Sequence, residues 1–159
     1  MRTTHYGNKY TTSLEIRQAW VNFLNKFVWD WFATLTFADP PKTYTAENKL
    51  NAWIKAIERE EKRKIGYFKA MEFTKQGVPH FHLLMGNLQG VERSKYWGLW
   101  FSKNGRARIL PYNSKLGAGY YLTKYVVKED CCNAVNWEVR GLEYMRQLVL
   151  DNQVNFWYT

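Results

Sequence analysis

Two of the three histidines in the chain lie on alternate residues of an apolar segment, residues 79–84 (PHFHLL). Alternate residues of a β-strand point to the same face of a sheet, so His80 and His82 would lie side by side. Neutral imidazoles are common metal ligands, and two neighbouring ones suit a single ion. The spacing therefore predicts a metal site, provided that this segment forms a strand.

Glu72 is the candidate third ligand. The apolar segments 66–73 and 79–85 flank a short turn that contains glycine, which predicts a β-hairpin. A turn centred near its glycine places Glu72 roughly opposite His82, with His80 diagonal to it, and such neighbours have Cβ atoms roughly 5 and 7 Å apart. A register slip of one residue would turn Glu72 to the other face of the sheet.

One carboxylate and two imidazoles leave coordination positions of a divalent ion open for a substrate oxygen, so the ion can act as a Lewis acid. This mixed ligand set suits Mn²⁺ or Mg²⁺, with zinc as a further alternative. The competing interpretation is that His80 and His82 are satisfied within the sheet and that Glu72 is solvated. Polar groups are unfavourable in an apolar strand without a partner, which favours the metal. His5 is interpreted as a surface residue.

Residues 120–128 (YYLTKYVVK) carry candidate nucleophiles. Tyr121 and Tyr125 are four residues apart and share a helix face, which Lys128 continues and Lys124 flanks. A phenol has a pKa near 10 and is a weak nucleophile, but nearby ammonium groups and a metal-polarised target favour its attack. The alternative is a core stripe of tyrosines whose flanking lysines extend to solvent.

The chain has 159 residues, a net charge of +9 and 18% aromatic residues. A basic chain favours an anionic partner, most often a nucleic acid, and abundant aromatic rings favour unpaired bases. A basic solvated surface is the alternative, and Trp97 and Trp100 are equally suited to a core. The candidate DNA-binding residues are Arg93, Lys95, Lys103, Arg106 and Arg108.

Apolar spacing and turn residues predict an α+β fold, with four or five mostly antiparallel strands and helices between them. Strands are expected at residues 31–37, 66–73, 79–85, 106–111 and 136–140. Helices are expected at residues 13–28, 46–64, 91–101, 115–129 and 142–151.

Other features concern the compartment and the domain content. The two cysteines, Cys131 and Cys132, are adjacent and do not indicate a disulfide framework, so a reducing, cytoplasmic setting is expected. Neither a signal peptide nor an apolar run of the roughly 20 residues that span a bilayer is apparent. No phosphate-binding glycine-lysine loop occurs, so residues 1–159 are expected to form a single domain without a helicase.

Three segments, in this order, resemble motifs of the HUH endonucleases, the replication initiators and relaxases that nick single-stranded DNA through a tyrosine. Residues 32–37 (FATLTF) look like the first motif, residues 79–84 like the second and residues 121–128 like the third. The two-tyrosine form is similar to that of small phage replication proteins and some transposases. Viral initiators carry a ligand glutamate eight residues before the first motif histidine, which Glu72 matches. The resemblance covers roughly residues 31–130.

The resemblance implies a central antiparallel sheet of about five strands, related to the ferredoxin-like and RRM-like folds, with the tyrosine helix beside the metal. It also implies that a tyrosine attacks the scissile phosphate, leaving a 5′-phosphotyrosine and a free 3′-hydroxyl that primes rolling-circle replication. One-tyrosine relatives keep the position that matches Tyr125, so Tyr125 ranks above Tyr121 as the first nucleophile. Lys128 and Lys124 would hold a phosphate or stabilise the phenolate.

The implied partners are single-stranded DNA at an origin hairpin and the helicase and polymerase of the host. The relaxase branch usually has a third histidine, which Glu72 would replace here. A transposase of the same chemistry and a non-catalytic module that binds single-stranded nucleic acid are the alternatives. A purely structural protein would leave the histidine pair and Glu72 unexplained.

Overall fold

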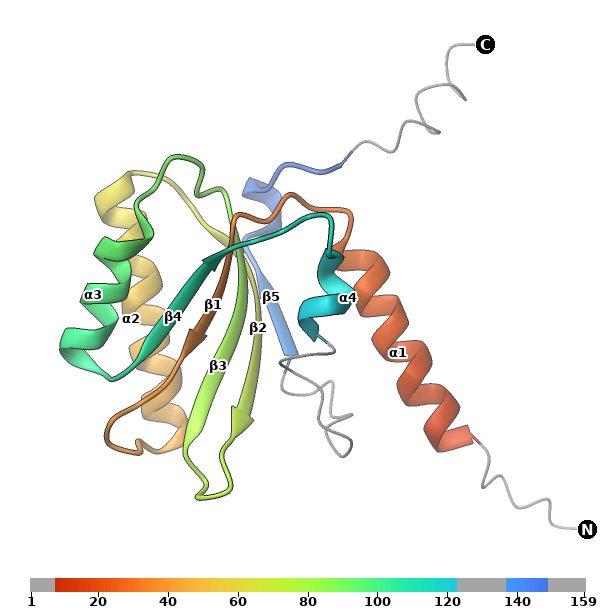
Figure 1. Cartoon of the computed structure of the whole chain (residues 1–159), viewed down its shortest axis with the longest axis horizontal. Helices are drawn as coiled ribbons and strands as arrows, with labels where there is room; N and C mark the ends of the chain where they lie inside the picture. Colours follow the sequence, from red (N-terminus) through yellow and green to blue (C-terminus); the bar gives the residue numbers. More distant parts are fainter. Residues whose placement is uncertain (1–7, 123–136, 149–159) are drawn as a thin grey trace, which may run out of the picture.

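The computed structural model describes residues 8–122 and 137–148 of the chain (Figure 1). Its elements confirm an α+β fold. In chain order they are α1 (Asn8–Leu24), β1 (Trp31–Leu35), α2 (Thr43–Glu61), β2 (Gly66–Phe73), β3 (Pro79–Gly86), α3 (Arg93–Lys103), β4 (Ala107–Pro111), α4 (Gly117–Tyr121), β5 (Trp137–Arg140) and the 3₁₀ turn η3 (Leu142–Tyr144).

The five strands form one antiparallel sheet in the order β4-β1-β3-β2-β5. From β1 to β4 the chain follows the β-α-β-β-α-β connectivity of ferredoxin-like folds. Strand β3, which carries both candidate histidines, is therefore central. Both strands of the predicted hairpin are largely buried, as expected for strands with neighbours on either side.

Each face of the sheet carries its own core, because side chains alternate along every strand. Helices α2 and α3 cover one face, where Trp53 and Trp100 pack against Phe81 and other odd-numbered residues of β3. Helices α1 and α4 lie on the opposite side (Figure 1), where Phe32 and Leu84 belong to a second core. The even-numbered residues of β3, including both histidines, face this second side.

Two of the expected helices differ from the structure. The first begins at Asn8 rather than Ser13, because the prediction relied on apolar spacing and residues 8–12 are polar. It ends at Leu24 rather than Val28, and the indole N–H of Trp29 donates to the carbonyl of Leu24 at 2.8 Å.

The helix expected over residues 142–151 is wrong for its described part. Only one 3₁₀ turn forms, and the chain is extended at Met145. The backbone then pairs with the segment that follows α1, since Val28 N–H donates to Arg146 O and Leu148 N–H donates to Lys26 O. These long-range hydrogen bonds replace the helical ones.

The other helices differ mainly at their ends. Helix α2 starts at Thr43 and ends at Glu61, where Lys62 adopts a left-handed conformation with φ 53°. Helix α3 is shifted two residues toward the C-terminus relative to its expected range. Residues 123–129 of the predicted tyrosine helix lie outside the described residues. Within the part of the chain that is described, no helix is both long and apolar enough to cross a bilayer.

Candidate metal centre

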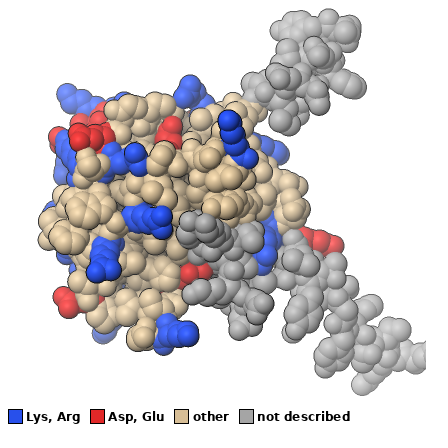
Figure 2. All heavy atoms as spheres, in the orientation of Figure 1, with Lys and Arg blue, Asp and Glu red and all other residues tan. Residues whose placement is uncertain are grey.

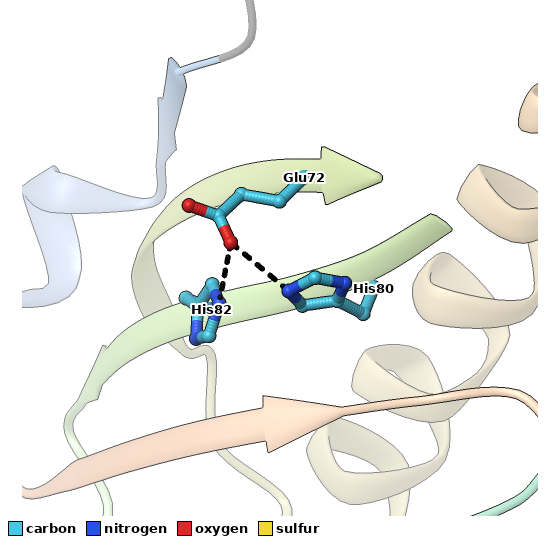
Figure 3. Close-up of side chains that lie close together, drawn as sticks. All are labelled: Glu72, His80 and His82. Atoms are coloured by element: carbon cyan, nitrogen blue, oxygen red, sulfur yellow. Dashed lines mark hydrogen bonds and ion pairs between the residues drawn. The ribbon is translucent and has the colours of Figure 1, made fainter. Parts of the chain in front are cut away.

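Glu72 from β2 and His80 and His82 from β3 converge on one face of the sheet (Figure 3). The Oε2 atom of Glu72 lies 3.0 Å from His80 Nε2 and 3.3 Å from His82 Nε2. All three side chains offer a ligand atom within 4.8 Å of the others. The cluster is largely shielded, since these side chains are 10%, 14% and 7% exposed, respectively. The predicted constellation of one carboxylate and two imidazoles is therefore present.

The hairpin register differs from the expected one without separating these residues. Glu72 pairs directly with His80, and His82 lies opposite Ala70, so His82 is the diagonal neighbour. The pairing is centred on Gln76 rather than Gly77, because Glu72 and His80 are equally far from it. Moving the centre by one residue shifts the partners by two, which keeps Glu72 on the same face.

The donor atoms fit a small divalent ion. Adjacent ligands of an octahedral ion with bonds of about 2.1 Å are about 3 Å apart, close to the two separations observed. Glu72 Oε1 is buried and has no hydrogen-bond partner among the described residues, so it is available as a further oxygen ligand. His80, His82 and Glu72 therefore form a possible metal-binding group, whose mixed nitrogen and oxygen ligands suit Mn²⁺ or Mg²⁺.

The electrostatics of Glu72 favour a cation site. Burial alone would raise the pKa of its carboxyl group, but hydrogen bonds with His80 and His82 lower that pKa to about 2. The carboxylate is therefore ionised throughout the neutral range. An ionised carboxylate next to imidazole nitrogens is the form that binds a divalent cation.

Two residues of β1 orient His82. The Oγ1 atom of Thr34 lies 3.3 Å from His82 Nδ1, and the ring of Phe32 is stacked on the imidazole at 6.2 Å with an interplanar angle of 10°. Partners on the far nitrogen of a ligand histidine fix its ring and tautomer. Sequence reasoning missed Thr34, because its contact with His82 depends on the pairing of β1 with β3.

Helix α4 carries the one predicted tyrosine that the structure describes. Tyr121 is 5% exposed and its ring lies 4.9 Å from that of Phe32, which links α4 to the strand beside the histidines. Its hydroxyl oxygen accepts the backbone N–H of Asn113 at 2.8 Å. Tyr125, Lys124 and Lys128 lie outside the described residues.

The five candidate DNA-binding residues lie on different sides of the sheet. Arg106 and Arg108 are exposed at the start of β4, and Arg108 pairs with Thr34, on the face that carries His82. The other three belong to α3, which packs on the opposite face. Of these, Lys95 forms an ion pair with Glu60 at 2.7 Å. Arg93 donates to a backbone carbonyl of β4, and Lys103 is exposed at the end of the helix.

A ferredoxin-like antiparallel sheet with an acidic and two imidazole ligands on one face defines an α+β protein with a candidate divalent-metal centre. The chain also matches, over residues 30–130, the family model described as Replication-associated protein ORF2/gene 2 protein. It therefore belongs to this family of phage rolling-circle replication proteins. Neither the curated proteins nor the solved structures gave a match. The family match confirms the resemblance to phage replication proteins, and the chain is a replication protein, for which DNA is the implied substrate.

Proposed function

We propose that this protein nicks and rejoins single-stranded DNA at a replication origin, in the cytoplasm of the host cell. The observation that carries the proposal is the convergence of Glu72, His80 and His82 on one sheet face, next to the strand on which α4 packs. Membership of a rolling-circle replication family supplies the DNA substrate. Nicking generates the 3′-hydroxyl that the host polymerase extends, while a host helicase separates the strands.

A divalent ion held by Glu72, His80 and His82 would supply Lewis-acid chemistry, withdrawing electron density from an oxygen of the scissile phosphate. The phenolic oxygen of a tyrosine attacks the phosphorus atom, and the bond from phosphorus to the 3′-oxygen breaks. The leaving 3′-oxygen takes up a proton and becomes a free hydroxyl, while the 5′-phosphate stays on the tyrosine. Attack by a 3′-hydroxyl on this phosphotyrosine reverses the step and rejoins the strand.

Tyr125 is the proposed first nucleophile. The hydroxyl of Tyr121 is buried and already accepts a hydrogen bond from Asn113, so Tyr121 must give up this contact before it can attack. Tyr121 is therefore assigned to the second transesterification. Lys128 and Lys124 provide positive charge for the phenolate or a bound phosphate.

The test is covalent capture of an origin-derived DNA single strand in the presence of Mn²⁺, read by gel shift under denaturing conditions and by mass spectrometry. Tyr125→Phe should reduce initial adduct formation at least about 100-fold, which corresponds to roughly 3 kcal/mol of activation free energy. Tyr121→Phe should slow rejoining more than the first nick, and a chelator should abolish both steps.

The matched control is Tyr44→Phe, because Tyr44 is 78% exposed and lies on α2, on the other side of the sheet. It should form the adduct at the wild-type rate. An adduct that persists in the double variant Tyr121→Phe/Tyr125→Phe would contradict the assignment of both nucleophiles. DNA binding with no adduct from the wild type would instead favour a non-catalytic binding module.

A further inference from the structure

Two aromatic rings on α3 are exposed and stacked on each other. Trp97 is 42% exposed and Phe101 is 55% exposed, and their rings lie 5.0 Å apart with an interplanar angle of 8°. The other α3 rings, Tyr96 and Trp100, are at most 1% exposed and belong to the core. Core packing therefore accounts for one half of the aromatic residues of this helix and leaves Trp97 and Phe101 on the surface.

This ring pair lies beside β4, the edge strand. Thr36 N–H donates to Arg106 O at one end of the strand, and Tyr112 N–H donates to Asp30 O at the other, so even-numbered residues form the hydrogen bonds between β1 and β4. The odd-numbered residues of β4 consequently direct their backbone groups away from the sheet. Their carbonyl oxygens are the groups that an added strand would need.

Side chains of α3 occupy these outward carbonyl oxygens. The indole N–H of Trp97 donates to Ala107 O at 2.6 Å, and Arg93 Nη1 donates to Ile109 O at 3.1 Å. The third outward residue, Pro111, has no N–H to offer. The edge is therefore closed to pairing with another β-strand, so its exposed surface suits a partner that does not extend the sheet.

The surroundings of the rings are basic. Arg106 and Arg108 are exposed at the start of β4, and Lys103 is exposed at the end of α3. A groove of about 470 Å³ runs between Phe101, Lys103 and Arg106. Figure 2 shows Lys and Arg side chains over the region that β4 occupies in Figure 1. Flat aromatic faces beside exposed cations match the bases and phosphates of a nucleic-acid single strand.

We propose that Trp97 and Phe101 form a base-stacking platform for the DNA strand that flanks the nick, with Arg106 and Arg108 contacting phosphates between the platform and the metal centre. Arg108 pairs with Thr34, which contacts His82, so β4 lies two strands, about 10 Å, from the histidine strand. This inference rests on the proposed function for its substrate. The platform would hold the strand on one side of the scissile phosphate.

Binding is measured apart from chemistry, by fluorescence anisotropy of a labelled single-stranded oligonucleotide of mixed sequence in the presence of chelator. Phe101→Ala and Trp97→Leu should each weaken binding about five- to fifty-fold, as loss of one stacked base predicts. Trp97→Phe keeps a ring and should stay within about three-fold of the wild type. Tyr44→Ala, which removes an exposed ring on α2, should bind as the wild type does.

Photocrosslinking gives an independent readout. An oligonucleotide substituted with 5-iodouracil should crosslink to the peptide that contains Trp97 and Phe101. Phe101 makes no hydrogen bond through its side chain, so Phe101→Ala and the crosslink decide the question even if Trp97→Leu does not fold. Unchanged affinity of a folded Phe101→Ala variant, with crosslinks only outside α3, would overturn the platform.

The two proposals fail separately. If the wild type forms the tyrosine adduct while Phe101→Ala binds DNA normally, the platform is wrong and nicking stands. If Phe101→Ala loses affinity and the wild type forms no adduct, the platform stands and nicking is wrong. Self-association in sedimentation that Phe101→Ala abolishes, with DNA affinity unchanged, would overturn the platform and assign this surface to a second copy of the chain.

Discussion

Both histidines approach the same oxygen atom of Glu72, so the charge of this one carboxylate organises the cluster. Without a metal, its lone pairs accept the imidazole N–H groups. With a metal, the same lone pairs and the deprotonated imidazole nitrogens become ligands. The cation and the protons therefore compete for one set of atoms, which makes both metal affinity and acid stability depend on Glu72.

Glu72→Gln tests the charge at nearly constant shape. The amide retains a carbonyl oxygen but loses the negative charge, so Mn²⁺ affinity should fall by about 100-fold or more, which is roughly 3 kcal/mol. Isothermal titration calorimetry measures this directly. The control is Glu143→Gln, an exposed glutamate in the 3₁₀ turn, which should bind Mn²⁺ as the wild type does. Equal affinities for the wild type and Glu72→Gln would remove Glu72 from the ligand set.

Acid should destabilise the metal-free protein through the same residue. Hydrogen bonds from His80 and His82 outweigh burial and lower the folded-state pKa of Glu72 to about 2, from its ordinary value of 4.5. A lowered folded-state pKa stabilises the fold above pH 4.5, and that contribution is lost as the pH falls toward 2. Its size is on the order of 3 kcal/mol.

Urea unfolding at several pH values checks this prediction. The difference in unfolding free energy between the wild type and Glu72→Gln should be greatest above pH 4.5 and should shrink toward pH 2. Parallel pH profiles for the two proteins would show that another group controls the acid transition.

At the scale of elements, the β2–β3 hairpin brings all three ligands together, and it was the most predictable part of the chain. Apolar segments on either side of a turn are typical of a hairpin, and Glu72 needed only the correct parity to share a face with the histidines. The positions of the strands and the α+β class were also predictable, because each strand has a distinct apolar segment.

Other elements depend on contacts that a local pattern does not contain. The segment after β5 has apolar residues at helical spacing, yet its backbone pairs with residues 26–28. The same spacing failed to distinguish Trp97, which is exposed, from Trp100, which is buried. Thr34 acquires its role only because β1 lies next to β3. These outcomes are set by which elements meet in space.

Lys69 joins three elements on the helix-covered face. Its side chain is 5% exposed, and its ammonium group pairs with Glu138 of β5 at 2.9 Å and with Glu47 of α2. Burial would lower the pKa of Lys69, but hydrogen bonds with both glutamates raise that pKa, so the residue is charged at neutral pH. The positive charge thus holds α2 and β5 against β2.

Lys69→Met keeps most of the buried stem and removes the charge, leaving two carboxylates close together. We expect the free energy of unfolding to fall by about 1–3 kcal/mol, less than for a fully buried pair because both glutamates are partly exposed. Chemical denaturation measures the change. Lys75→Met, at the exposed tip of the hairpin, is the control and should change stability by less than about 0.5 kcal/mol. An unchanged stability in Lys69→Met would mean that the ion pairs contribute nothing net.

At the scale of the whole molecule, the sheet separates two kinds of surface. One face carries the metal ligands, with Arg106 and Arg108 at its β4 edge, whereas the other is covered by α2 and α3. Lys95 lies on this covered side and is paired with Glu60. The net charge of +9 is therefore less informative than the side on which each cation lies. Sequence alone grouped these cations together because they lie close in the chain.

The salt dependence of DNA binding distinguishes these cations. Arg106→Gln and Arg108→Gln should each weaken binding to single-stranded DNA, and each should reduce the slope of log K against log salt by about 0.7, the value for one phosphate contact on a single strand. Lys95→Gln removes the same charge from the helix-covered side and should leave the slope unchanged, because its ammonium group is engaged by Glu60. Titrations between about 50 and 200 mM salt measure the three slopes. Equal losses in all three variants would mean that overall charge, rather than the β4 edge, attracts the DNA.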